Sequence, residues 1–195
     1  MANVVDFPGT ERSQTRYTTV AIVLHWTIAV LLVLQIIGGW VAEDVLKGAA
    51  KFQAFQIHKS MGLTILLLTF ARLAWRLGHK PPPPPAGMPD WQKTVATAVH
   101  VGFYLLLIAI PLSGLVLISS SSYVVKTMWW GLVQVPELPL RGLENSKAIH
   151  DAAGNAHSLL VWGTIVLWAL HVGAALKHQF VDRDGVLGRM LPFLK

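Results

Sequence analysis

The 195-residue sequence contains no cysteine and few charged residues. Without cysteine, the chain forms no disulfide, no thiolate zinc site, no cysteine-ligated iron–sulfur cluster and no covalent c-type haem attachment. Charged residues make up 13% of the chain, against about 25% in an ordinary soluble domain. So small a share does not cover the surface of a soluble domain, and a hydrophobic content of 53% excludes intrinsic disorder. The composition therefore indicates an integral membrane protein.

Four long apolar stretches account for the hydrophobic excess. They cover residues 20–42, 57–77, 95–118 and 157–176, and each is close to the roughly 20 residues that cross a bilayer core as a helix. No short apolar core with a cleavage site precedes the first stretch, so we expect it to be retained. Backbone groups in lipid must find hydrogen bonds within the protein. The sequence therefore predicts an all-α fold, in which residues 1–195 form one domain, a four-helix up-down bundle in the membrane.

Lysine and arginine are unevenly divided between the two ends of this bundle. An arm at residues 1–19, the connection between the second and third stretches, and a tail at residues 177–195 carry nine of them, whereas the other two connections carry five. Because basic residues concentrate on the cytoplasmic side, we expect both termini in the cytoplasm. The charges form no continuous stripe, which argues against nucleic-acid binding. The nine residues are Arg12, Arg16, Arg76, Lys80, Lys93, Lys177, Arg183, Arg189 and Lys195.

Two connections have a distinctive composition. Residues 81–85 are five consecutive prolines, which favour a stiff polyproline II strap between helices over a recognition segment. The last connection contains Trp129 and Trp130. Together with Trp40 and Trp91, these side chains are interpreted as anchors at the membrane interfaces.

Histidines within the apolar stretches are the main candidates for chemistry, because an ionisable side chain in lipid is costly and faces the bundle interior. His157 and His171 lie fourteen residues apart, which is about 21 Å along one helix, and they leave the same face of it. Counting residues from each membrane surface gives His25 the depth of His171, and gives His58 the depth of His157. The result is two transverse pairs of imidazoles, each suited to the axial positions of a b-type haem.

Spacing alone leaves other interpretations of the histidines open. A buried histidine often only hydrogen-bonds a neighbouring carbonyl, whereas a transition-metal site or a proton relay would need carboxylates that the stretches almost lack. His100 reaches the depth of His25 and His171. His150 lies seven residues before His157. The spacing therefore does not decide which two of three histidines are ligands at each level, although we expect His100 to hydrogen-bond a haem propionate or the backbone.

Several polar residues lie near the cytoplasmic ends of the stretches. His79 is beside the proline run and is set aside as a ligand, and His178 is expected at the headgroup level as a surface residue. Arg72 lies deeper, where its guanidinium is a candidate partner for the propionates of the inner haem. Arg76 has two equally supported roles, a propionate partner or a cytoplasmic topology anchor.

Short motifs spread over the chain after residue 16 resemble the bacterial cytochrome b561 family. They are His25-Trp26, Gln56-Ile57-His58-Lys59-Ser60-Met61-Gly62, Arg72-Leu73 with Arg76, Ile110-Pro111-Leu112-Ser113-Gly114, His157, Leu170-His171-Val172-Gly173-Ala174-Ala175-Leu176-Lys177-His178, and Arg189-Met190-Leu191-Pro192. The resemblance implies a four-helix cytochrome of the bacterial inner membrane with two haem b groups. The ligands that it implies are His25, His58, His157 and His171.

The same resemblance implies electron exchange between the periplasmic side and the quinone pool, and some members are similar to a superoxide:quinone oxidoreductase. We therefore expect electrons to pass from a periplasmic donor, with superoxide or a protein redox partner as candidates, to ubiquinone, without a catalytic side chain. One alternative is a haem-bearing anchor for a periplasmic dehydrogenase or hydrogenase. Another, of a different class, is a non-redox transporter or structural bundle protein. Lys126, Arg141 and Lys147 in the outer connection either steer a small anion or are ordinary solvated charges.

Overall fold

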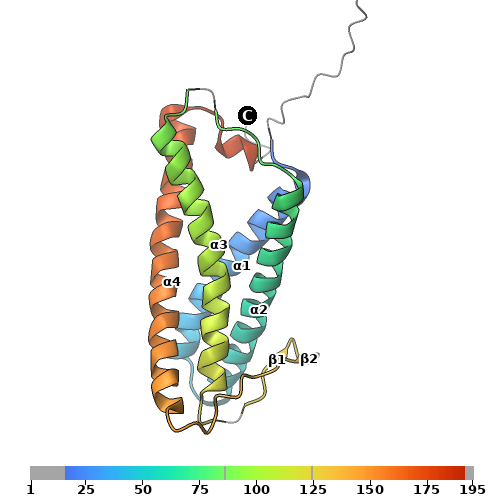
Figure 1. The fold of residues 1–195 in the computed structure, drawn as a ribbon, viewed down its shortest axis with the longest axis vertical. Helices are drawn as coiled ribbons and strands as arrows, with labels where there is room; N and C mark the ends of the chain where they lie inside the picture. Colours follow the sequence, from blue (N-terminus) through green and yellow to red (C-terminus); the bar gives the residue numbers. More distant parts are fainter. Residues whose placement is uncertain (1–15, 86, 124, 192–195) are drawn as a thin grey trace, which may run out of the picture.

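The computed structural model describes residues 16–85, 87–123 and 125–191 (Figure 1). Its long helices are α1 (Thr19–Trp40), α2 (Gly48–Gly78), α3 (Asp90–Ser119) and α4 (Ser146–Lys177). All four are long and apolar enough to cross a membrane, so the predicted all-α, four-helix membrane bundle is confirmed. Arg12, Pro192 and Lys195, which the sequence analysis used, lie outside the described residues.

The two ends of the bundle differ (Figure 1). At one end, which we name the terminal end, α1 begins and α4 runs on into a π-helical turn (His178–Asp182) and a 3-10 turn (Leu187–Arg189). At the opposite end, the hairpin end, α1 runs on into a π-helical turn (Val41–Val45). There the connection between α3 and α4 also forms a small antiparallel hairpin of β1 (Met128–Trp129) and β2 (Val133–Gln134).

Helices α2, α3 and α4 are longer than the apolar stretches that predicted them. α2 begins at Gly48 and not near residue 57, and α4 begins at Ser146 and not near residue 157. Hydropathy marks only the apolar part of a helix, whereas backbone hydrogen bonding carries a helix on through polar turns. His58 and His157 consequently lie well inside their helices and not at their starts. The hairpin in the long connection was not expected from the sequence.

The buried apolar core is one small layer in the middle of the bundle. It consists of Ile28, Leu32, Ile65 and Leu107. Most large apolar side chains instead point outward, where acyl chains of the membrane would cover them. Helices in lipid therefore associate through close packing and not through exclusion of water.

Close packing between α3 and α4 depends on a glycine. A Cβ built at Gly102 of α3 would lie 3.2 Å from Cδ2 of Leu167 in α4. Such small residues let two helix backbones approach each other in a membrane. By contrast, a Cβ built at Gly163 on the exposed side of α4 would meet nothing within 4 Å.

We expect Gly102→Leu to lower the thermal unfolding midpoint of the detergent-purified protein, because the added side chain pushes α3 away from α4. Overpacking of this kind costs about 1–3 kcal/mol, which corresponds to a decrease of roughly 2–10 °C for a chain of this length. Gly163→Leu is the matched control and should leave the midpoint nearly unchanged. Equal midpoints for the two variants would contradict the packing role of Gly102.

Candidate functional site

One pair of imidazoles lies at the hairpin end of the bundle. The ring of His58, from α2, and the ring of His157, from α4, have their centres 6.3 Å apart and their planes inclined by 62°. The two residues lie far apart in the sequence, so only the packing of α2 and α4 around the interior brings them together. The predicted depth match of these two histidines is confirmed.

A second group of imidazoles lies near the terminal end. The ring centres of His25 in α1 and His171 in α4 are 6.2 Å apart, with planes inclined by 69°. His100 in α3 approaches the same His171 ring, at 5.7 Å between centres. The structure thus brings together all three histidines that the sequence placed at this depth, and His171 is the member that touches both others.

Each pair has the spacing that a shared metal ion requires. Two imidazoles bound to opposite sides of one ion, each with a metal–nitrogen bond of about 2 Å, have ring centres roughly 6 Å apart. The pairs His58–His157 and His25–His171 both match this value. His100–His171, at 5.7 Å, comes close to it as well, so the distance does not by itself select the partner of His171. Carboxylates take no part in either pair. The residues present therefore fit two axial nitrogen ligands on a haem iron better than a mixed nitrogen and oxygen metal site.

The ring of His157 is held in one orientation by α3. Its Nδ1 lies 3.1 Å from the carbonyl oxygen of Ile110 and 3.0 Å from Oγ of Ser113. A carbonyl can only accept, so Nδ1 carries the proton and donates it, while Nε2 keeps its lone pair. A histidine that binds a metal usually donates its other ring nitrogen in this way. The arrangement leaves Nε2 of His157 available as a ligand.

The ring of His58 packs closely against α1, and one of its nitrogen atoms has no hydrogen-bond partner among the described residues. A Cβ at Gly39 of α1 would lie only 3.0 Å from Cε1 of His58, so no larger residue fits there without a shift. Nδ1 of His58 is buried and has no hydrogen-bond partner among the described residues. A buried polar atom without a partner costs about 1–3 kcal/mol. The same Nδ1 lies 3.3 Å from the built Cβ of Gly39, so it faces α1.

Two further residues support the hairpin-end pair, and the sequence analysis assigned no role to either. Nε2 of Gln35 in α1 donates to the carbonyl oxygen of His58, 2.8 Å away, which ties α1 to α2 at the level of the imidazoles. Gly114 of α3 lies against the His157 ring, 3.5 Å from Cε1 to a built Cβ. Gln35 could have been singled out from the sequence, because it is an isolated glutamine in an otherwise apolar stretch. Gly114 gave no signal of its own.

Arg72 lies beside the group of imidazoles at the terminal end. It extends from α2 toward both neighbouring helices, with Nε 3.3 Å from the hydroxyl oxygen of Tyr104 and Nη1 3.2 Å from the carbonyl oxygen of Ala21. Arginine has five N–H donors, so these two contacts leave others free for an anionic group. Arg72 thus lies near the terminal-end imidazoles, as the sequence predicted, and has N–H groups available for a haem propionate.

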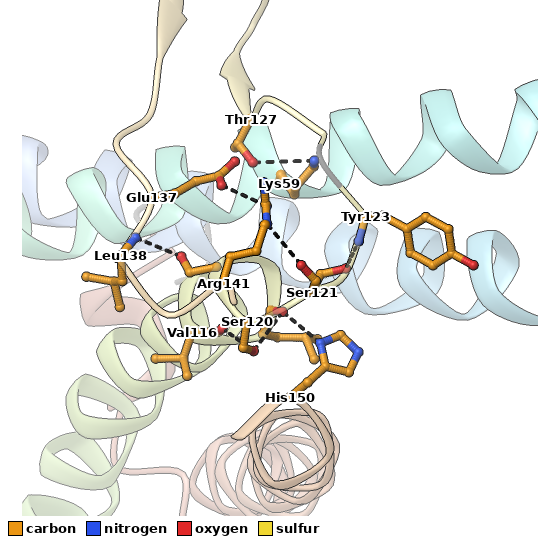
Figure 2. A network of polar contacts seen from close by, with 12 residues as sticks. Lys59, Val116, Ser120, Ser121, Tyr123, Thr127, Glu137, Leu138, Arg141 and His150 are labelled. Atoms are coloured by element: carbon orange, nitrogen blue, oxygen red, sulfur yellow. Dashed lines mark hydrogen bonds and ion pairs between the residues drawn. The ribbon is translucent and has the colours of Figure 1, made fainter. Parts of the chain in front are cut away.

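The remaining histidines have other partners. Nδ1 of His150 donates to the carbonyl oxygen of Leu117, 2.9 Å away, at the end of α3 (Figure 2). His150 therefore links α4 to α3. The imidazole that lies beside His58 is that of His157 and not that of His150. His178 was expected at the surface, but its side chain is only 15% exposed, since Nδ1 lies 2.6 Å from a carboxylate oxygen of Asp184.

Two of the three basic residues that either steer an anion or are ordinary solvated charges have ion-pair partners. Arg141 contacts Glu137 at 2.9 Å and donates to the carbonyl oxygen of Ser121 (Figure 2). Lys147 lies 2.7 Å from a carboxylate oxygen of Asp151. The Arg141 pair is partly buried and has a structural role, whereas Lys147 is 88% exposed and is an ordinary solvated charge.

Comparison with known proteins agrees with this geometry. The sequence model of a family described as "Prokaryotic cytochrome b561" matches residues 16–193. The chain is 30% identical over 177 residues to "Cytochrome b561 homolog 2" of Escherichia coli, which covers 90% of this chain and 91% of that protein. It is 28% identical to the "Probable superoxide oxidase CybB" of Yersinia pestis, over 91% of this chain and 96% of that protein. The chain therefore belongs to the prokaryotic cytochrome b561 family, and is a multi-pass bacterial membrane b-type cytochrome of electron transfer.

Proposed function

We propose that this cytochrome carries electrons across the membrane, between a one-electron donor on the periplasmic side and ubiquinone. One observation carries the proposal: α4 contributes one imidazole to each of two pairs that lie toward opposite ends of the bundle. Two sites separated along one membrane-spanning helix connect the two faces of the membrane. A single site would not do so.

We assign one haem b to each histidine pair. His58 and His157 would be the axial ligands at the hairpin end, and His25 and His171 those at the terminal end. Haem supplies reversible one-electron redox chemistry when it is bound. A haem held by two imidazoles of the chain would leave oxygen no free coordination position, which favours electron transfer over oxygen binding.

The other residues named above orient the ligands and exclude water. Ile110 and Ser113 fix the tautomer of His157, and Arg72 would donate charge-assisted hydrogen bonds to a propionate. The apolar core layer lies between the two histidine levels.

The direction of transfer rests on the distribution of charge and on the relatives. The excess of basic residues supports a cytoplasmic terminal end, which makes the hairpin end periplasmic. The similarity to a protein named as a superoxide oxidase supports superoxide as the donor. Each superoxide gives up one electron and becomes dioxygen, so two of them, with two protons, would reduce one ubiquinone to the quinol.

The purified protein should bind about two haem b groups per chain, and His157→Ala should reduce this to about one, because one axial ligand is lost. A pyridine haemochrome assay on detergent-purified protein measures the ratio. His150→Ala is the matched control, since it removes an imidazole one heptad away that hydrogen-bonds the end of α3, and it should retain both haems. Colourless protein, or loss of a haem in the control alone, would refute the assignment.

Ser113→Ala should weaken the haem at the hairpin end without abolishing it, because His157 loses one of two acceptors for Nδ1 while Ile110 remains. Removing such a supporting hydrogen bond typically costs about 10–100-fold in affinity. Titrating haem back into apoprotein measures the change. Ser158→Ala, at the exposed position next to His157, should bind haem as the unaltered protein does. Equal affinities for the two variants would contradict the role of Ser113.

Superoxide mixed with the oxidised, haem-loaded protein in a stopped-flow spectrometer should reduce it, and added ubiquinone should reoxidise it. The absorbance bands of b-type haem follow both steps. Superoxide dismutase should suppress the reduction. If superoxide leaves the spectrum unchanged while another one-electron donor reduces it, superoxide is not the donor, and a protein redox partner takes its place.

A further inference from the structure

An open cavity lies at the terminal end, between the first turns of α1 and the last turns of α2. It is a small pocket that opens to the surface. Tyr104 of α3 forms part of its lining, together with Tyr17 and Thr18 at the start of α1. The cavity is therefore formed by three helices at the depth where spanning helices leave the apolar part of a membrane.

The lining of this cavity is strongly basic. Arg72 and Arg76 lie four residues apart on one side of α2, and Lys80 follows just after the helix ends at Gly78. His79 lines it too, and no acidic side chain does so among the described residues. Neither Arg76 nor Lys80 has an ion-pair partner within the described ranges. The cavity therefore favours an anion.

The walls are rigid and aromatic. Nε1 of Trp75 donates to Oγ1 of Thr18, 2.9 Å away, and its ring stacks on His79 with centres 3.9 Å apart and planes inclined by 5°. Beyond Lys80 the chain enters the proline strap, where the Arg189 guanidinium donates to the carbonyl oxygen of Pro83. These contacts fix the backbone and the aromatic side chains around the cavity.

The surroundings identify the source of the anion. Val20 on α1 and Leu77 on α2, which flank the cavity in the sequence, are 40% and 83% exposed, and would contact acyl chains. Tryptophan and tyrosine are enriched at the level of lipid headgroups. Basic pockets between helices on the cytoplasmic side bind anionic headgroups, and arginine pairs well with phosphate oxygens.

We propose that this cavity binds the phosphate of an anionic phospholipid, with Arg76 and Lys80 as its main charge partners. Arg72 forms the floor of the cavity and is shared with the imidazole group beside it. Free phosphate and a haem propionate offer related oxyanion chemistry. The experiment below separates these sources from the lipid.

The test compares the haem-loaded protein with the double variant Arg76→Gln, Lys80→Gln. Each is titrated with phosphatidylglycerol or phosphatidylcholine in detergent, and both the thermal midpoint and the lipid retained in native mass spectrometry are recorded. We expect phosphatidylglycerol alone to raise the midpoint of the unaltered protein, and the double variant to lose about half or more of that rise. Lys93→Gln is the matched control. This basic residue lies at the same end, but it pairs with Asp90 at 2.8 Å and lies outside the cavity.

Three results would overturn the proposal. One is an undiminished response in the double variant, and another is an equal loss in the control, which would indicate general charge attraction. The third is a lower haem content in the double variant with lipid retention unchanged, which would assign the cavity to a propionate. Millimolar inorganic phosphate should give no comparable stabilisation, and if it does, the site is one for free phosphate. If the double variant fails to fold, Lys80→Gln, at an exposed position beyond α2, is measured in the same way.

Discussion

Imidazoles in the apolar interior of a membrane bundle need partners, and this need governs how the four helices pack. An ionisable side chain in lipid is costly unless it is paired or bound. The hairpin-end pair shows how the chain responds. Gly39 makes room for the His58 ring, the Ile110 carbonyl takes the proton of His157, and Gln35 ties α1 to α2 at the same level. Contacts to the imidazole rings thus shape the interior at this end, and the apolar core between the two histidine levels is small.

The two ends of the bundle meet this need in different ways. At the hairpin end one pair of imidazoles stands alone, because His150 is engaged by the end of α3. At the terminal end three imidazoles gather beside Arg72, and His171 touches both of the others. A cluster of like, titratable rings next to a guanidinium is stable only if the rings stay largely neutral. A metal ion meets that condition, since it binds the unprotonated form.

Much of the arrangement was predictable from the sequence, because it follows from helix geometry. Fourteen residues between His157 and His171 fix both the face and the separation, and counting from the membrane surfaces found their partners. The bounds of α2 and α4 were not predictable, since hydropathy does not register polar helical turns. The role of His150 was equally hidden, because its acceptor belongs to a helix end 33 residues away in sequence. Contacts of that kind depend on how α3 and α4 pack, which no local pattern encodes.

Since α4 is the last of the four helices in chain order, it is also the last to leave the ribosome. Each imidazole pair takes one member from α4. Neither pair can therefore form while only the first three helices are in the membrane. During synthesis the bundle therefore holds His25 and His58 without their partners until the final segment inserts. If the pairs hold haem as proposed, loading would follow completion of the chain, and a truncated product lacking α4 would retain neither pair.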